Sequence, residues 1–196
     1  MKRTACLALA ACLALGSALA DDSEPPYDLE REELVCESPP FKLERPSDSW
    51  VFLKLDVLQE RARAEQRDPS SFETLKAQLW WGDAKASIYV RAFGDRVHRR
   101  EPATSDTFAE GQLQHLLGAL GDAELKKRTH AKVSKRVATV LEVQGKNGDG
   151  KDWLVQEAVV YRQQDVQIFV ISLEGPADRA KDLRKQFKKL LKKVRL

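Results

Sequence analysis

The final third of the chain most strongly constrains the fold, because three apolar runs precede one amphipathic run there. The apolar runs are rich in valine, isoleucine and aromatic residues, as is typical of β-strands. Glycine, asparagine and aspartate fill residues 145–150, and residues 162–165 are short and polar, so both gaps favour tight hairpins. We therefore predict an antiparallel three-strand meander closed by a helix over residues 177–194. The three predicted strands span residues 137–143, 153–161 and 166–173.

Apolar residues in the third of these strands alternate onto both of its faces. Successive side chains of a strand leave opposite faces of a sheet, so an apolar residue on both faces requires cover on both. We therefore expect this strand to be central. The second strand contains Gln156 and Glu157, so we expect it to be less completely covered.

The closing helix is predicted to have one apolar and one basic face. Its apolar side chains recur at i, i+4, i+7, i+8 and i+11, which places them on one stripe about 100° wide. We expect this stripe to dock on the sheet, with Phe187 and Leu190 in the core. The stripe consists of Leu183, Phe187, Leu190, Leu191 and Val194.

Composition indicates one ordinary globular domain with short tails. The chain has 196 residues, of which 42% are hydrophobic and 32% charged. A chain of this length and hydrophobic content can bury a core. Its net charge of +3 says little about partners. The distribution of charge says more, because residues 21–49 are strongly acidic and residues 179–195 strongly basic.

Residues 1–20 are typical of an export signal. Lys2 and Arg3 precede an apolar segment that is too short to span a membrane, and Ala18-Leu19-Ala20 forms a cleavage site before Asp21. We therefore predict an exported protein, periplasmic or secreted. Two alternatives remain open: a lipoprotein anchored at Cys12, within Leu9-Ala10-Ala11-Cys12, and an uncleaved anchor.

Residues 21–40 are predicted to be a mostly irregular tail, because they are acidic, contain two Pro-Pro pairs and have few apolar residues. Removal of the leader would leave Cys36 as the single thiol. An odd cysteine cannot form an internal bridge, so we expect it to be free in a mobile segment. The alternative is an intermolecular disulfide in an otherwise monomeric or weakly oligomeric protein.

Residues 41–196 are predicted to form a single α+β domain, an antiparallel sheet sandwiched by helices. Before the meander we expect four strands, a mostly polar helix and an amphipathic helix, followed by a charged connection over residues 123–134. The strands are expected near residues 41–44, 50–53, 72–81 and 86–93, and the helices over 56–67 and 106–120.

The order of these parts resembles the PsbP-like domain family. The segment from Phe41 to Phe52 has the pattern F-x-L-x-x-P-x-x-x-W-x-F, with which such domains tend to open. The strand pair ending at Ile88-Tyr89-Val90, the middle helix and the closing helix support the likeness, which covers about residues 41–196. The resemblance implies an α/β/α sandwich, but no particular role, because the fold hosts unrelated functions and many exported bacterial relatives have no assigned chemistry.

No motif for catalysis, a metal or a cofactor stands out. His98, His115 and His130 are not paired at metal-ligand spacing, and we expect each to be a solvated surface residue. Residues 145–156 resemble a calcium loop, but the positions of its first and last ligands hold Gly145 and Gln156. We therefore predict a plain hairpin there, no cofactor, and a protein that is not an enzyme.

Two features are candidates for binding a partner. The first is the basic face of the closing helix, especially Lys185, Lys188, Lys189 and Lys192, which suits an acidic protein, a polyanion or an anionic membrane surface, but not nucleic acid in an exported protein. A solvated face, or neutralisation by the acidic tail, would explain the same charges.

The second is Trp80-Trp81, where we expect one ring in the core and allow the other in a contact surface. We predict an exported, non-catalytic binding or accessory module. The alternatives are a secreted enzyme with a site assembled from scattered residues, and a lipid-anchored structural component of the cell envelope.

Overall fold

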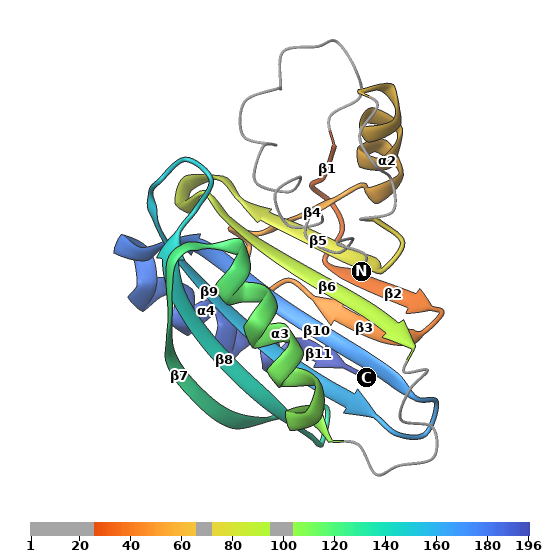
Figure 1. The fold of residues 1–196 in the computed structure, drawn as a ribbon. Helices are drawn as coiled ribbons and strands as arrows, with labels where there is room; N and C mark the ends of the chain where they lie inside the picture. The colour runs from red at the N-terminus through yellow and green to blue at the C-terminus, as the bar shows by residue number, and fades with distance from the viewer. Residues whose placement is uncertain (1–25, 66–71, 95–103) are drawn as a thin grey trace.

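A large antiparallel sheet dominates the computed structural model, which describes residues 26–65, 72–94 and 104–196. Every neighbouring pair of its eight strands is antiparallel (Figure 1), as expected for an α+β protein. In spatial order the strands are β1 (Tyr27–Asp28), β4 (Val51–Leu53), β5 (Leu75–Trp81), β6 (Ala86–Gly94), β10 (Gln167–Pro176), β9 (Asp152–Arg162), β8 (Arg136–Lys146) and β7 (Gly121–Val133).

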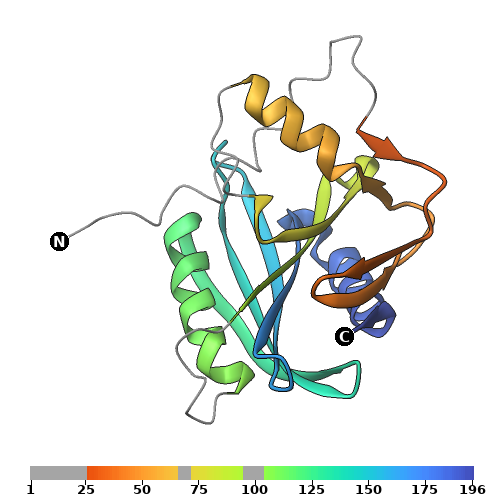
Figure 2. The same ribbon diagram turned by 90° about the vertical axis from the view of Figure 1, so that its right-hand side faces the viewer.

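Helices cover both faces of this sheet. Figure 2 shows α3 (Ser105–Ala119) on one side and α4 (Ala180–Lys193) on the other. The third helix, α2 (Leu55–Ala64), lies near the short strands at the β1 edge. Two single turns of 3₁₀-helix, η3 (Gly82–Ala84) and η4 (Ala177–Arg179), precede β6 and α4. In the described part of the chain, no helix is long and apolar enough to cross a bilayer.

A separate core lies on each side of the sheet, as the alternation in the third meander strand predicted. In β10, Phe169 and Ile171 pack into the core beneath α4, whereas Ile168 and Val170 pack into the core beneath α3. This strand lies between β6 and β9, so its central position is confirmed. The predicted meander of β8, β9 and β10 and its closing helix are also confirmed.

The expectation that the second meander strand is less completely covered is wrong. Gln156 and Glu157 in β9 are buried, with 7% and 2% of their surface exposed. Gln156 donates to Glu142, and Glu157 accepts from Ser172, so each polar side chain is satisfied at least in part by a neighbouring strand. Hydrogen bonds from neighbouring strands therefore allow polar residues in a covered strand.

The predicted irregular tail contains regular structure in its described part, residues 26–40. In addition to β1, it forms β2 (Glu33–Glu37), which pairs with β3 (Pro40–Glu44) in a three-stranded sheet completed by β11 (Val194–Arg195). Cys36 therefore lies half-buried in a strand against the core beneath α4, with a free thiol. The tail orders because β3, anchored by buried Phe41 and Leu43, offers it backbone partners.

The predicted charged connection over residues 123–134 is also wrong, because this segment belongs to strand β7. Half-buried residues such as Ala123, Leu125 and Ala131 alternate there with exposed charged residues. β7 is the last strand of the sheet, with only β8 beside it. A strand in that position needs few apolar side chains, and its lysines discourage pairing with another chain.

Candidate functional site

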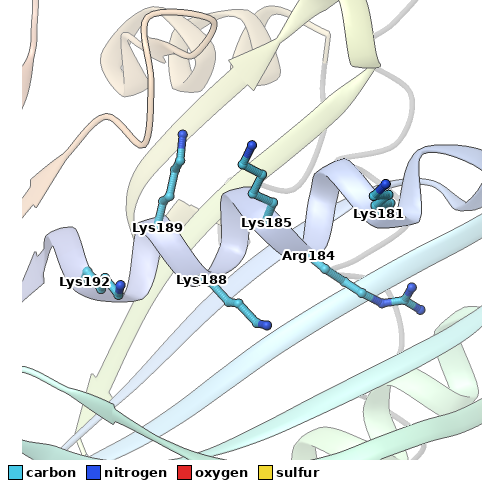
Figure 3. A pocket seen from close by; sticks show the side chains of 6 residues that line it. All are labelled: Lys181, Arg184, Lys185, Lys188, Lys189 and Lys192. Carbon is cyan, nitrogen blue, oxygen red and sulfur yellow. The ribbon is translucent and has the colours of Figure 1, made fainter.

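Five exposed lysines form one continuous face of α4, which we call the lysine face. They recur at i, i+4, i+7, i+8 and i+11, so they occupy an arc about 100° wide opposite the buried apolar stripe. Figure 3 shows the four lysines predicted from the sequence on the side of α4 that faces away from the sheet. The lysine face consists of Lys181, Lys185, Lys188, Lys189 and Lys192.

The charges of the lysine face are not compensated within the described structure. The basic residues beside it have partners: Arg184 pairs with Glu142, Lys193 with Glu44, and Arg179 with Asp182. Among the described residues, no carboxylate forms an ion pair with any of the five lysines. Together with Arg184 they line a hollow of about 430 Å³, and no other described element contributes to its lining (Figure 3).

Arg184 anchors the helix rather than contributing to the lysine face. Its guanidinium donates to Glu142 on β8, with Nη2 2.7 Å from Oε1 and Nε 3.1 Å from Oε2. Gln156 of β9 donates to the same carboxylate at 2.9 Å, and the hydrogen bond to Glu142 raises the pKa of Arg184. This connection fixes the rotation of α4 on the sheet, so that the lysine face points outward.

The two tryptophans do not form a common surface. Both are half-buried, and as neighbours on β5 they face opposite sides of the sheet. Trp81 packs against buried Trp50, with ring centroids 5.6 Å apart, and the guanidinium of Arg179 lies 5.6 Å from its centroid. Trp81 therefore lies beside the start of α4, whereas Trp80 lies on the other face.

The described part of the acidic N-terminal segment forms no ion pair with the lysine face. Two of its described carboxylates pair within their own sheet or near it: Glu33 with Lys42 at 3.2 Å, and Glu32 with Arg45 at 3.8 Å. The interpretation that the acidic tail masks the basic helix therefore has no support from residues 26–40. Residues 21–25 lie outside the described residues.

A buried polar cluster beneath α3 was missed by the sequence analysis. Ser172 donates to Glu157 Oε2 at 2.9 Å, and Tyr89 donates to Glu174 Oε1 at 3.1 Å. Burial raises the pKa of Glu157 to about 7 and also raises the pKa of Glu174. The Oε1 atom of Glu157 is buried and has no hydrogen-bond partner in the described structure.

This cluster surrounds a cavity of about 10 Å³, enough for about one water molecule. Two glutamates within strands of otherwise apolar character were the one signal that pointed to it. Carboxylates with raised pKa values are typical of active sites, but a cavity of this size does not admit a substrate. In the described part of the chain, no three His, Cys, Asp or Glu side chains are placed to hold a metal.

A larger groove of about 710 Å³ lies beside the start of α3, between the helix and the ends of β8 and β9. Ser105 and Asp106 in this groove form hydrogen bonds with neighbouring backbone and side-chain groups. Ser105 donates to the carbonyl of Val137 at 2.8 Å and accepts from the amide of Tyr161 at 3.1 Å. Asp106 accepts from Thr139 at 2.9 Å. Ser105 therefore donates to a backbone carbonyl rather than to a basic side chain of the described structure.

The two described histidines, His115 and His130, take part in separate contacts. His130 on β7 lies 3.0 Å from Asp106, and this contact, with that of Thr139, lowers the pKa of Asp106. His115 is half-buried rather than solvated, and burial lowers its pKa, with a smaller effect from Arg91. His98 lies outside the described residues. The glycine-rich turn is a hairpin, in which Asn147 Oδ1 accepts from the amides of Asp149 and Lys151.

No protein-family model matches the sequence, and no curated protein matches it either. Solved structures do match the fold. Cyanobacterial PsbP from Synechocystis sp. PCC 6803 superposes with a TM-score of 0.54 at 10% identity, covering 89% of this chain and 95% of its own. The chain has the Mog1/PsbP-like fold. This confirms the resemblance that the opening segment and the order of elements indicated.

Two further structures with the Mog1/PsbP-like fold come from other organisms. LpqN of Mycobacterium tuberculosis, described as involved in cell envelope biogenesis, has a TM-score of 0.52 at 13% identity and covers 79% of this chain and 82% of its own. The Ran-binding protein Mog1p of Saccharomyces cerevisiae has a TM-score of 0.50 at 12% identity, covering 85% and 95%. At such identities the likeness establishes the Mog1/PsbP-like fold, which hosts varied binding roles.

Proposed function

We propose that this protein is an exported, non-catalytic binding or accessory module that contacts an anionic partner through the lysine face. The observation that carries the proposal is a row of five exposed lysines that form no ion pair in the described structure. The ion pair between Arg184 and Glu142 holds this row outward. The Trp81–Arg179 contact lies near the start of α4, outside the five lysines of the lysine face.

The energetics of the free helix support a partner. Lysines four positions apart on a helix face repel one another, and this face contains three such pairs: 181 with 185, 185 with 189, and 188 with 192. An anionic partner would relieve that repulsion. The same number of charges interspersed with glutamates would keep the protein soluble without this cost, so solubility alone is the weaker explanation.

A secreted enzyme is the second candidate function, and the buried cluster around Glu157 and Glu174 is the observation that favours it. The cavity there is smaller than any substrate, so we rank this function below binding. A lipid-anchored envelope component is compatible with the binding role, because an acyl chain at Cys12 and a basic surface would act together.

Reversing Lys185, Lys188, Lys189 and Lys192 to glutamate is expected to abolish association with the native envelope fraction. The association of the unaltered protein should fall with added salt, because exposed charges are screened over about 8 Å at physiological ionic strength. Co-sedimentation with the envelope fraction over a salt series measures both effects. The thermal unfolding midpoint should change little, since these side chains are exposed.

The matched control reverses four exposed lysines outside α4, namely Lys85, Lys132, Lys135 and Lys151. This variant has the same net charge as the first but keeps the lysine face, so it should retain most of the association. Equal loss in both variants would show that overall charge, rather than the lysine face, governs the contact. No association of the unaltered protein at low salt would contradict the proposal itself.

The export part of the proposal predicts that the mature protein begins at Asp21. Intact-mass spectrometry of the protein from its native cells should show loss of residues 1–20 and no added mass. A chain that begins at a diacylglyceryl-modified Cys12 would contradict this prediction and would place the protein on a membrane.

A further inference from the structure

The lysine face lacks the side chains that anchor a specific protein partner. The centres of protein interfaces are enriched in tyrosine, tryptophan and arginine and depleted in lysine. Arg184 is engaged by Glu142, and the helix's one aromatic residue, Phe187, is buried with 2% of its surface exposed. Lysine is a strongly hydrated point charge on a flexible stem, which suits a diffuse anionic surface better than a carboxylate bound in fixed geometry.

The shape of the lysine face also favours a diffuse anionic surface over a specific protein partner. The five residues span twelve positions of α4, and the eleven steps between the first and the last cover about 16 Å along the helix axis. In Figure 3, Lys185 and Lys189 extend toward one flank of the helix and Lys188 toward the other. Because the described residues that line the open hollow between them all belong to α4, no second element walls it into a groove, and the lysine face projects from the helix. A peptide partner needs a groove or a strand edge, whereas a flat surface can meet a projecting helix face.

We propose that the lysine face docks the protein on a membrane surface that contains anionic phospholipid. This inference rests on the proposed binding function and names its partner. Asp182, the one acidic residue within α4, is paired with Arg179 at 3.4 Å, so it adds little repulsion. The face exposes no apolar side chain, so the contact is electrostatic and peripheral, without insertion into the acyl chains.

The test measures binding of the natively processed protein to phosphatidylcholine vesicles with and without phosphatidylglycerol, by flotation at low and physiological salt. Binding should require phosphatidylglycerol and should weaken with salt. Each lysine near an anionic bilayer strengthens binding about fivefold, so a variant with Lys185, Lys188, Lys189 and Lys192 changed to glutamine should bind more than about 100-fold more weakly.

Two further variants separate charge from other effects. Changing the same four lysines to arginine keeps the charge and should keep vesicle binding. Changing Lys85, Lys132, Lys135 and Lys151 to glutamine removes the same charge from elsewhere on the surface and should weaken binding less than about fivefold, because charges beyond a Debye length are largely screened. Circular dichroism of each variant verifies that it is folded.

Three results would overturn the inference. Lysine-dependent association with the envelope fraction but not with anionic vesicles would identify the partner as an acidic protein or a polyanion, and would leave the proposed binding function intact. Equal binding to neutral and anionic vesicles would show that the lysine face does not make the contact. Binding to neither vesicles nor the envelope fraction would reject this inference together with the proposed function.

Discussion

Replacing Leu190 with alanine is expected to lower the free energy of unfolding by about 2–5 kcal/mol, the usual range for a buried leucine. Leu190 is 0% exposed and packs in the core between α4 and the sheet, together with Phe187 and Leu183. The substitution removes buried apolar surface and leaves a cavity that the neighbouring side chains fill only in part. Urea unfolding monitored by circular dichroism measures the change.

Lys189 provides the matched control for this variant, because it is the preceding residue on the same helix and is exposed. Lysine and alanine both favour helices, so Lys189→Ala should change the free energy of unfolding by less than about 0.5 kcal/mol. If Leu190→Ala had an effect equally small, the apolar stripe of α4 would not be packed on the sheet in solution, and the lysine face would not be held outward.

Replacing Glu157 with glutamine is expected to stabilise the protein at pH 8 and to leave its stability almost unchanged at pH 4.5. Burial raises the pKa of this carboxyl group from 4.5 to about 7. Between pH 4.5 and about pH 7, Glu157 keeps its proton in the folded protein but has lost it in the unfolded chain. The free energy of unfolding therefore falls as pH rises through this interval.

The expected size of this effect is on the order of 3 kcal/mol, because each pKa unit corresponds to about 1.4 kcal/mol. Glutamine has nearly the shape of the protonated carboxyl group and can still accept from Ser172, so the variant should not show this decline. Burial also raises the pKa of Glu174, which adds a change of the same sign. The lowered pKa of His115 acts in the opposite sense, because stability from a depressed histidine is lost as pH falls.

The measurement compares urea unfolding of the two proteins from pH 4.5 to pH 8, so that contributions from His115 and Glu174 largely cancel in the difference. Glu60→Gln on α2 is the control, because Glu60 is exposed. Its stability should follow that of the unaltered protein at every pH. Parallel curves for Glu157→Gln and the unaltered protein would mean that Glu157 is solvated, and that the cluster beneath α3 opens in solution.

The local order of residues was sufficient to predict the meander, the closing helix, the central position of β10 and the lysine face. Each of these depends on the repeat of side chains within one element: two residues for a strand and 3.6 for a helix. The five lysines of α4 lie opposite its buried stripe whatever the rest of the chain does, because both sets are fixed by the same helical geometry. The opening from Phe41 to Phe52 added the fold resemblance.

Tertiary structure alone decided which polar residues are buried and which irregular segments become strands. Arg162 opens the segment that was predicted to be a short polar connection, residues 162–165, but only 1% of its surface is exposed. It donates to Asp165 and to the carbonyl of Pro40, and it lies 4.6 Å from the ring centroid of Phe169. Pro40 is 122 positions away along the chain, so no local pattern predicts this contact.

Contacts between residues that are distant in the sequence also decide three other features: strand β2, the buried glutamates beneath α3, and the ion pair of Arg184 with Glu142. A strand of low hydrophobicity forms when a neighbour offers backbone partners, and a buried polar side chain is tolerated when distant residues bond to it. These partners lie on other elements, so their positions become known only when the sheet is assembled. The sequence therefore determined which face of α4 is charged, and the assembled sheet decided that this charge is uncompensated and points outward.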